Sequence, residues 1–161
     1  MFELFKKKKD DKNIYAAVEG KCIDISRVND KTFADKLMGD GIAIVPTATV
    51  IKAPINGVIT MLFPTKHAFG IKRDDGLEIL VHIGINTVEL NGKGFIAYKN
   101  VNDSVHVGDK IIGFNESYLK DKDMTTMIII TTPIGNYDKT KIDKDVRCKD
   151  VIMQNEINKK D

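Results

Sequence analysis

Turn-forming residues divide this chain into segments that are too short for ordinary helices. Glycine, proline, aspartate and asparagine recur roughly every eight to twelve residues, a spacing typical of β-sandwiches and barrels. The runs between them are rich in β-branched and aromatic residues, which favour strands. We expect strands at residues 16–25, 42–45, 49–52, 58–63, 67–72, 77–83, 95–98, 110–114, 125–132 and 147–153. The predicted fold is all-β, a single antiparallel sandwich or barrel.

Helical patterns are confined to two short stretches, residues 31–38 and 116–122. Both are shorter than a typical helix of a globular protein. We therefore expect one or two short helical turns on the β domain. A chain of 161 residues is the size of one domain and long enough to bury a core.

The positive charge of the chain is concentrated at its N-terminus. Residues 1–12 hold five lysines against three acidic residues, and the whole chain has a net charge of +2, so the remainder is neutral. A neutral body without tryptophan argues against a nucleic-acid partner. We interpret residues 1–14 as a flexible basic leader and residues 15–161 as the domain. Contact of the leader with an anionic membrane is the less favoured alternative.

The sequence contains neither a secretory signal nor an apolar stretch long enough to span a membrane. At the N-terminus, the apolar residues precede the lysine run, which reverses the order found in a signal. Cys22 and Cys148 are isolated, and without export they are most simply reduced thiols. We expect a soluble cytoplasmic protein.

The residues of chemical interest lie in one predicted hairpin around Asp75-Gly76. With Asp74-Asp75 as the loop, His67 faces His82 directly; with Asp75-Gly76 as the loop, the two are diagonal. Both registers place the histidines on one face, roughly 5 Å or 7–8 Å apart between backbone positions, unless a bulge shifts the pairing. Thr65 shares that face if the strand is straight.

Two adjacent imidazoles have three possible roles. A zinc site needs three or four ligands, and the remaining histidine, His106, is better interpreted as a surface residue. A nucleophile with an orienting partner suits phosphoryl transfer, which depends on positioning and electrostatics. The third possibility is that they have no chemical role and are two polar residues on a solvated sheet face. Spacing alone leaves all three open.

Three segments give the chain a specific resemblance. They are residues 33–44 (FADKLMGDGIAI), 65–71 (TKHAFGI) and 80–95 (LVHIGINTVELNGKGF). In these segments, and over residues 15–153 generally, the chain resembles the glucose-type enzyme IIA of the bacterial phosphoenolpyruvate-dependent sugar phosphotransferase system. Because no transport domain accompanies it, the chain is similar to the free-standing form.

The resemblance implies a phosphoryl carrier that acts only with partner proteins. It implies that His67 carries phosphate on Nε2, that His82 stabilises the phosphoryl group, and that the Thr65 hydroxyl orients His82. The implied donor is the histidine-containing phosphocarrier protein, and the implied acceptor is a cysteine of the sugar permease's IIB domain. The resemblance also implies regulatory partners, a monomer, and membrane contact only through the permease (IIB/IIC).

The resemblance further implies an apolar docking surface around the histidines. Asp30 matches a carboxylate that receives an arginine of the donor, whereas Asn86 stands where the family carries a second aspartate. No cofactor is required, but zinc is expected between proteins, bound by His67, His82 and a partner carboxylate. Five apolar residues match docking positions and are expected to be exposed: Phe33, Leu37, Met38, Phe63 and Val88.

Two rival interpretations belong to other classes. A zinc hydrolase of related β architecture would need a third ligand and a general base, neither of which is evident near the histidines. A biotinyl- or lipoyl-type carrier is suggested by residues 53–57 (APING) and 107–109 (VGD). That class needs a modified lysine on a tight hairpin, and its Met-Lys-Met or Asp-Lys-Ala sequence does not occur here.

Overall fold

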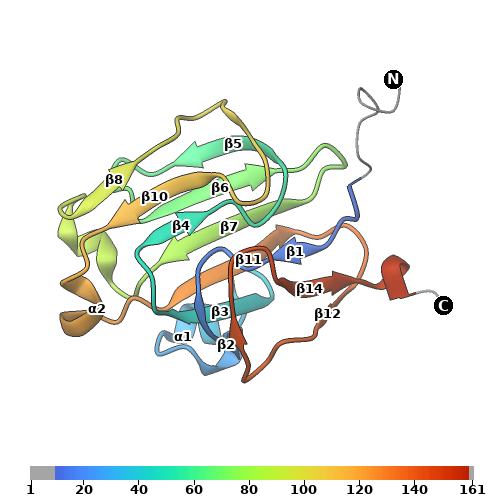
Figure 1. Ribbon diagram of the computed structural model, residues 1–161, viewed down its shortest axis with the longest axis horizontal. Helices are drawn as coiled ribbons and strands as arrows, with labels where there is room; N and C mark the ends of the chain where they lie inside the picture. Colours follow the sequence, from blue (N-terminus) through green and yellow to red (C-terminus); the bar gives the residue numbers. More distant parts are fainter. Residues whose placement is uncertain (1–9, 160–161) are drawn as a thin grey trace.

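The computed structural model describes residues 10–159 and confirms the all-β prediction (Figure 1). Every strand pairing in this part of the chain is antiparallel. The strands are β1 Ile14–Tyr15, β2 Gly20–Asp24, β3 Gly41–Pro46, β4 Val50–Lys52, β5 Gly57–Leu62, β6 Ala68–Lys72, β7 Glu78–Ile83, β8 Phe95–Ala97, β9 Ser104–Val105, β10 Lys110–Phe114, β11 Thr126–Thr132, β12 Tyr137–Lys139, β13 Asp145–Val146 and β14 Val151–Asn155.

Three sheets organise the described strands. The largest has eight strands in the order β13-β2-β3-β11-β7-β6-β5-β9, and the other two are ordered β4-β10-β8 and β1-β14-β12. Neighbours such as β3 and β11 are distant in sequence, so the turn pattern that predicts the strands does not predict their order. Among the described residues, no helix is both long and apolar enough to cross a membrane.

The large sheet separates two apolar clusters. Alternation along a strand sends successive side chains to opposite faces. In β7, Val81 and Ile83 therefore belong to the main core, while Leu80 belongs to a smaller cluster on the other face. His82 follows the same alternation and projects on the side of the smaller cluster.

The helical segments are shorter than predicted. In place of residues 31–38 the helix α1 spans Lys31–Ala34, and in place of 116–122 the helix α2 spans Tyr118–Asp121. Lys36 has a φ of 61°, which is incompatible with continuing α1. Short 3-10 segments complete the list: η2 Ile25–Arg27, η3 Thr87–Leu90 and η4 Glu156–Lys159.

The β6–β7 hairpin is present, but both predicted registers are wrong by one residue. Lys72 pairs with Glu78 and Ala68 with His82. The loop has three residues: Gly76 N–H donates to the Arg73 carbonyl (3.0 Å), and Gly76 has a φ of 99°. This is a turn followed by a glycine bulge, which adds a residue to the two-residue loops assumed from the sequence.

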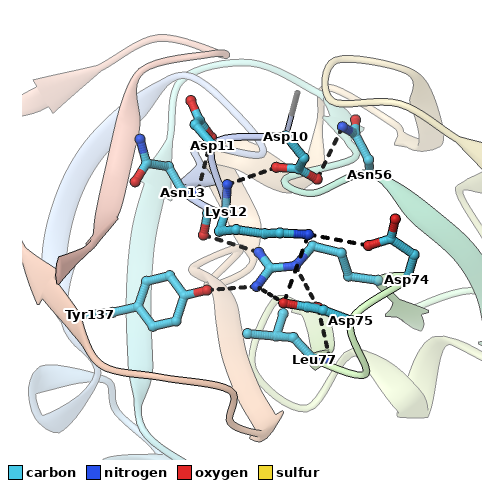
Figure 2. A network of polar contacts seen from close by, with 10 residues as sticks. Asp10, Asp11, Lys12, Asn13, Asn56, Asp74, Asp75, Leu77 and Tyr137 are labelled. Carbon is cyan, nitrogen blue, oxygen red and sulfur yellow. Dashed lines mark hydrogen bonds and ion pairs between the residues drawn. The ribbon is translucent and has the colours of Figure 1, made fainter. Parts of the chain in front are cut away.

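The tip of this hairpin is tied to the N-terminal segment by a buried arginine. The Arg73 side chain is 1% exposed and donates to both oxygens of Asp75, to the Lys12 carbonyl and to the Tyr137 hydroxyl. The Lys12 ammonium pairs in turn with Asp74 at 3.2 Å, as Figure 2 shows. Arginine can fill several hydrogen bonds at once, so it holds three segments together.

These contacts correct the expected boundary of the leader. Residues 10–14 were assigned to a flexible leader, yet Lys12 joins the Arg73 network and Ile14 is fully buried and pairs with Met153. Residues 1–9, including the apolar residues considered for membrane contact, lie outside the described part of the chain.

Candidate functional site

His82 lies near the end of β7 and is oriented by the backbone just beyond it. Its Nδ1 lies 3.0 Å from the Gly84 carbonyl oxygen. A carbonyl can only accept a hydrogen bond, so Nδ1 must carry the proton. In the neutral ring, Nε2 then keeps its lone pair, which is the state a nucleophile requires.

The turn after β7 is built to present that carbonyl. Gly84 has a φ of 79°, and a Cβ at this position would lie 2.4 Å from Cγ2 of Thr87. The buried Thr87 hydroxyl donates to the Ile83 carbonyl, and Gly84 N–H donates to the Thr125 carbonyl (3.0 Å). Glycine is therefore required here by both conformation and space.

His67 reaches the same site from a turn rather than from a strand. It precedes β6 and follows Lys66, whose φ is 57°. The His67 backbone lies opposite Ile83, whose N–H donates to the His67 carbonyl (2.7 Å), so in a regular strand the His67 side chain would point to the other face. The turn instead brings its ring to 4.9 Å from the His82 ring, with the planes inclined by 77°. The predicted proximity is confirmed, although the reason given for it is not.

Thr65 contacts a different histidine from the one expected. Its Oγ1 lies 2.6 Å from Nδ1 of His67, whereas the Nδ1 partner of His82 is the Gly84 carbonyl. The expectation that Thr65 orients His82 is therefore wrong. Lys66 N–H donates to the Phe63 carbonyl (2.8 Å), which closes the turn that folds Thr65 back over His67.

Two aromatic rings flank the histidines. Phe33 lies 4.7 Å from His82 and Phe63 lies 5.1 Å from His67, measured between ring centroids. Burial is the largest cause that lowers the pKa of His82, to about 4, and repulsion from a charged His67 adds to it. Burial also lowers the pKa of His67. Both imidazoles are consequently neutral at neutral pH.

The two histidines differ in their access to solvent. His67 is only 3% exposed, whereas His82 is partly exposed. The ring of His82 nevertheless lies between the rings of Phe33 and His67. These neighbours bury much of the imidazole, which explains why the pKa of His82 is lowered although the residue is partly exposed. Of the pair, His82 is the more accessible to a partner protein.

The expected docking residues divide into an exposed group and a buried one. Leu37, Met38 and Val88 are 73%, 42% and 49% exposed, as expected of docking residues. Phe63 is half-buried. Phe33 is 7% exposed and packs in the smaller core cluster, so the expectation of an exposed Phe33 is wrong.

The polar positions expected on the docking surface have distinct local roles. Asp30 caps α1, because its carboxylate accepts a hydrogen bond from Thr32 N–H at 3.0 Å. Its charge also favours protonated His82. Asn86 is exposed and has a φ of 59°, a conformation that asparagine tolerates better than most residues.

The site holds two imidazoles that could bind a metal, fewer than a complete zinc site needs. Among residues 10–159, no group of three His, Cys, Asp or Glu side chains could hold a metal ion. His106 is exposed, and its N–H donates to Asp109, which fits the interpretation of a surface residue. The segments that suggested a swinging-arm carrier instead bond to each other, through Gly108 N–H and the Ala53 carbonyl (3.0 Å).

Sequence reasoning missed the contribution of the backbone to this site. Gly84 was quoted within the segment 80–95, but no role was predicted for its carbonyl. Its position two residues after His82, before a polar turn, was the available signal. Thr87 was missed for the same reason: its hydroxyl acts on the Ile83 carbonyl rather than on a reacting group.

Comparison with known proteins agrees with this geometry. Residues 12–136 match the family described as phosphoenolpyruvate-dependent sugar phosphotransferase system, EIIA 1. The chain is 43% identical over 123 residues to the PTS system glucose-specific EIICBA component of Staphylococcus carnosus (strain TM300), a match that covers 76% of this chain. The chain spans only 18% of that longer protein.

A solved structure supports the same relationship. The glucose permease IIA from Mycoplasma capricolum superposes with a TM-score of 0.82 and 33% sequence identity, over 92% of this chain and 96% of the other. The family match covers most of the chain, and the fold and sequence similarities agree with it. The chain therefore belongs to the EIIA 1 family of the phosphoenolpyruvate-dependent sugar phosphotransferase system.

Proposed function

We propose that this protein carries a phosphoryl group on Nε2 of His82. It receives the group from the histidine-containing phosphocarrier protein and passes it to a cysteine of the sugar permease's IIB domain. The observation that carries the assignment is the hydrogen bond from His82 Nδ1–H to the Gly84 carbonyl, which leaves Nε2 unprotonated.

This assignment reverses the roles that the sequence resemblance implied. His67 was expected to be the acceptor and His82 its stabiliser. Three features favour the reverse: the fixed tautomer of His82, its greater exposure, and the bond between Thr65 and His67. A hydroxyl that donates to Nδ1 of His67 leaves the proton on Nε2, where it can hydrogen-bond a phosphoryl oxygen.

The transfer is a displacement at phosphorus. The Nε2 lone pair of His82 forms a bond to phosphorus while the P–N bond of the donor's phosphohistidine breaks, and the donor's imidazole leaves with that electron pair. In the second transfer a cysteine thiolate attacks, and the P–N bond to His82 breaks. His67 stabilises the charge on the phosphoryl oxygens in both steps.

The surroundings of the site suit protein partners rather than a small substrate. We take the exposed residues Leu37, Met38 and Val88 as an apolar rim of the site, and Asp30 is close enough to His82 for its charge to act on that ring. A few apolar anchors with charges at the edge are typical of transient interfaces. We place the protein in the cytoplasm as a monomer that meets the membrane only at the permease and that also serves regulatory partners.

Zinc fits this donor set only when a partner completes it. Nδ1 of each histidine is engaged, by Thr65 or Gly84, so only the Nε2 atoms could bind the metal. His67 would then carry its proton on Nδ1 and donate it to the Thr65 hydroxyl, the reverse of the arrangement proposed for phosphoryl transfer. Four-coordinate zinc needs further donors, such as a partner's carboxylate. In such a complex zinc would hold the two proteins together, and the proposed transfer proceeds without it.

Mass spectrometry tests the proposal directly. The chain is incubated with phosphoenolpyruvate, enzyme I and the phosphocarrier protein, and its intact mass is measured before and after mild acid. We expect one acid-labile phosphoryl group. His82→Gln should abolish it, whereas His67→Gln should retain acceptance and transfer poorly to the IIB domain. Normal labelling of His82→Gln would overturn the assignment.

A further inference from the structure

A single excursion of the chain carries much of the proposed docking surface. β2 and β3 are direct neighbours in the large sheet, with Asp24 paired to Ile42. The intervening residues 25–40, here called the docking loop, leave the sheet between these strands. They contribute Phe33, which packs on His82, and the exposed Leu37 and Met38. The position of this loop therefore determines where the apolar rim lies relative to His82.

One lysine joins the two ends of the docking loop. The Nζ of Lys139, at the end of β12, lies 2.5 Å from Oδ1 of Asp24 and 2.6 Å from Oδ1 of Asp40. Asp24 precedes the loop and Asp40 is its last residue. The lysine comes from 99 residues further along the chain than Asp40 and is 18% exposed. Its charge offsets two carboxylates that would otherwise repel each other across the base of the loop.

Both carboxylates also organise the backbone next to them. Asp24 accepts hydrogen bonds from the backbone N–H (3.0 Å) and the hydroxyl (2.5 Å) of Ser26. It thereby caps the start of the 3-10 segment η2. Asp40 accepts from Gly41 N–H at 2.8 Å, where β3 begins. The same ion pairs lower the pKa of both carboxyls, against the effect of burial. Movement of Lys139 would thus disturb the entrance and the exit of the loop together.

Other contacts do not replace this arrangement. Lys36 also pairs with Asp40, at 3.4 Å, but it belongs to the loop itself and is about half exposed. The ion pair between Arg27 and Asp143 joins the start of the docking loop to the segment after β12. It does not reach Asp40 at the end of the loop. Within residues 10–159, Lys139 is the cation that contacts the carboxylates at both ends.

We propose that Lys139 is a positioning residue for partner docking: it fixes the docking loop so that its apolar rim and Phe33 stand at the correct place beside His82. This inference rests on the proposed function, because it assumes that the phosphocarrier protein binds this rim. It predicts that a residue on β12, away from the histidines, controls affinity without touching the reacting groups.

The test compares three full-length variants. Lys139→Met removes the charge, Lys139→Arg retains it, and Lys144→Met makes the same change of net charge at an exposed lysine on the following loop. Binding of the unphosphorylated phosphocarrier protein is measured by calorimetry. Amide chemical shifts of residues 25–40 are measured by NMR on the free protein, together with the phosphoryl transfer rate at saturating donor.

We expect Lys139→Met to weaken binding of the phosphocarrier protein by about five-fold, which is the scale of losing a partly buried cluster of ion pairs. The saturating rate should stay within about two-fold, since the histidines are untouched. Shift changes should extend through the docking loop. Lys139→Arg should restore most of the affinity, and Lys144→Met should match the unmodified chain. If the Lys139→Met variant does not fold, it is replaced by the double variant Lys139→Met/Asp40→Asn. The second substitution removes the Asp40 charge, which the loss of Lys139 would leave without this partner.

Two results would overturn the inference. One is equal affinity of the Lys139→Met and Lys144→Met variants, and the other is a set of shift changes confined to β12. Failure of the proposed function looks different: the unmodified chain would not bind the phosphocarrier protein, while the NMR measurement would still report whether Lys139 holds the loop.

Discussion

The rings of Phe33 and His82 are in direct contact, with centroids 4.7 Å apart and planes inclined by 54°. Phe33 belongs to α1 and His82 to β7, so this contact joins the docking loop to the proposed nucleophile. It also contributes to the burial that lowers the pKa of His82. Under the proposed function, partner docking and the state of the nucleophile would be linked through this aromatic side chain.

Truncation of Phe33 should affect stability as well as function. Because Phe33 is 7% exposed, we expect Phe33→Ala to cost about 3 kcal/mol and to lower the melting temperature by about 6–12 °C. The pKa of His82 should rise toward its ordinary value as water reaches the ring. Thermal melting and NMR titration of the histidine ring protons measure the two effects.

Leu37 provides the matched control within the same loop. It is 73% exposed, so Leu37→Ala should change stability by less than about 0.5 kcal/mol while weakening binding of the phosphocarrier protein. An unchanged melting temperature for Phe33→Ala would contradict the buried position of that ring.

Thr65 should act on transfer rather than on acceptance. Thr65→Val removes the hydroxyl 2.6 Å from His67 Nδ1 at similar volume, so the proton on His67 is no longer directed to Nε2. We expect phosphoryl transfer to slow by about ten-fold or more, the scale of one lost stabilising donor. Nitrogen chemical shifts of His67 report the tautomer, and Thr65→Ser should behave as the unmodified chain. A His67 tautomer that does not change in Thr65→Val would contradict this role.

Sequence reasoning recovered the elements of this fold better than their connections. Strand positions follow from turn residues and β-branched runs, which are local signals. The neighbours β3 and β11 are brought together by tertiary packing, and no local pattern specifies that pairing. The short helices were found because their apolar spacing is local, but their ends depend on conformations such as the positive φ of Lys36.

The candidate site shows the same division between local and tertiary information. His67 and His82 were identified correctly as neighbours, yet the three-residue loop changed the register by one residue. Their roles depend on Nδ1 partners, and one of these is the carbonyl of Gly84, which any residue type could supply. Burial of Phe33 was also unpredictable, since core and docking residues share the same apolar character.

Acid should destabilise the protein through its histidines. The folded-state pKa of His82 is about 4 against an ordinary value of 6.5, so the unfolded chain binds more protons between these values. The contribution of neutral His82 to the free energy of unfolding is therefore fully present above about pH 6.5. It is lost as the pH falls toward 4, and the loss from this group is at most about 3 kcal/mol. His67 contributes in the same direction.

Chemical denaturation at several pH values measures this dependence. His82→Gln should flatten the decrease in the free energy of unfolding between pH 6.5 and 4. Acidic groups with lowered pKa values, such as Asp24 at about 2, lose their contribution at still lower pH. A His82→Gln variant with the full pH dependence would refute the buried, neutral state of this ring.

The charge at the edge of the docking surface should control the rate of association. Asp30→Asn keeps the cap of α1, since asparagine also accepts from Thr32 N–H, but removes the carboxylate that we expect to receive the donor's arginine. Asn86→Asp makes the opposite change at an exposed residue whose left-handed conformation aspartate tolerates. We expect Asp30→Asn to lower the association rate of the phosphocarrier protein by about three- to ten-fold at low salt, and Asn86→Asp to raise it by a similar factor.

Both differences should shrink as salt screens the charges, while the maximal transfer rate changes little. Stopped-flow mixing at two ionic strengths separates these effects. Equal association rates for the two variants at low salt would mean that this edge does not face the donor's positive charge.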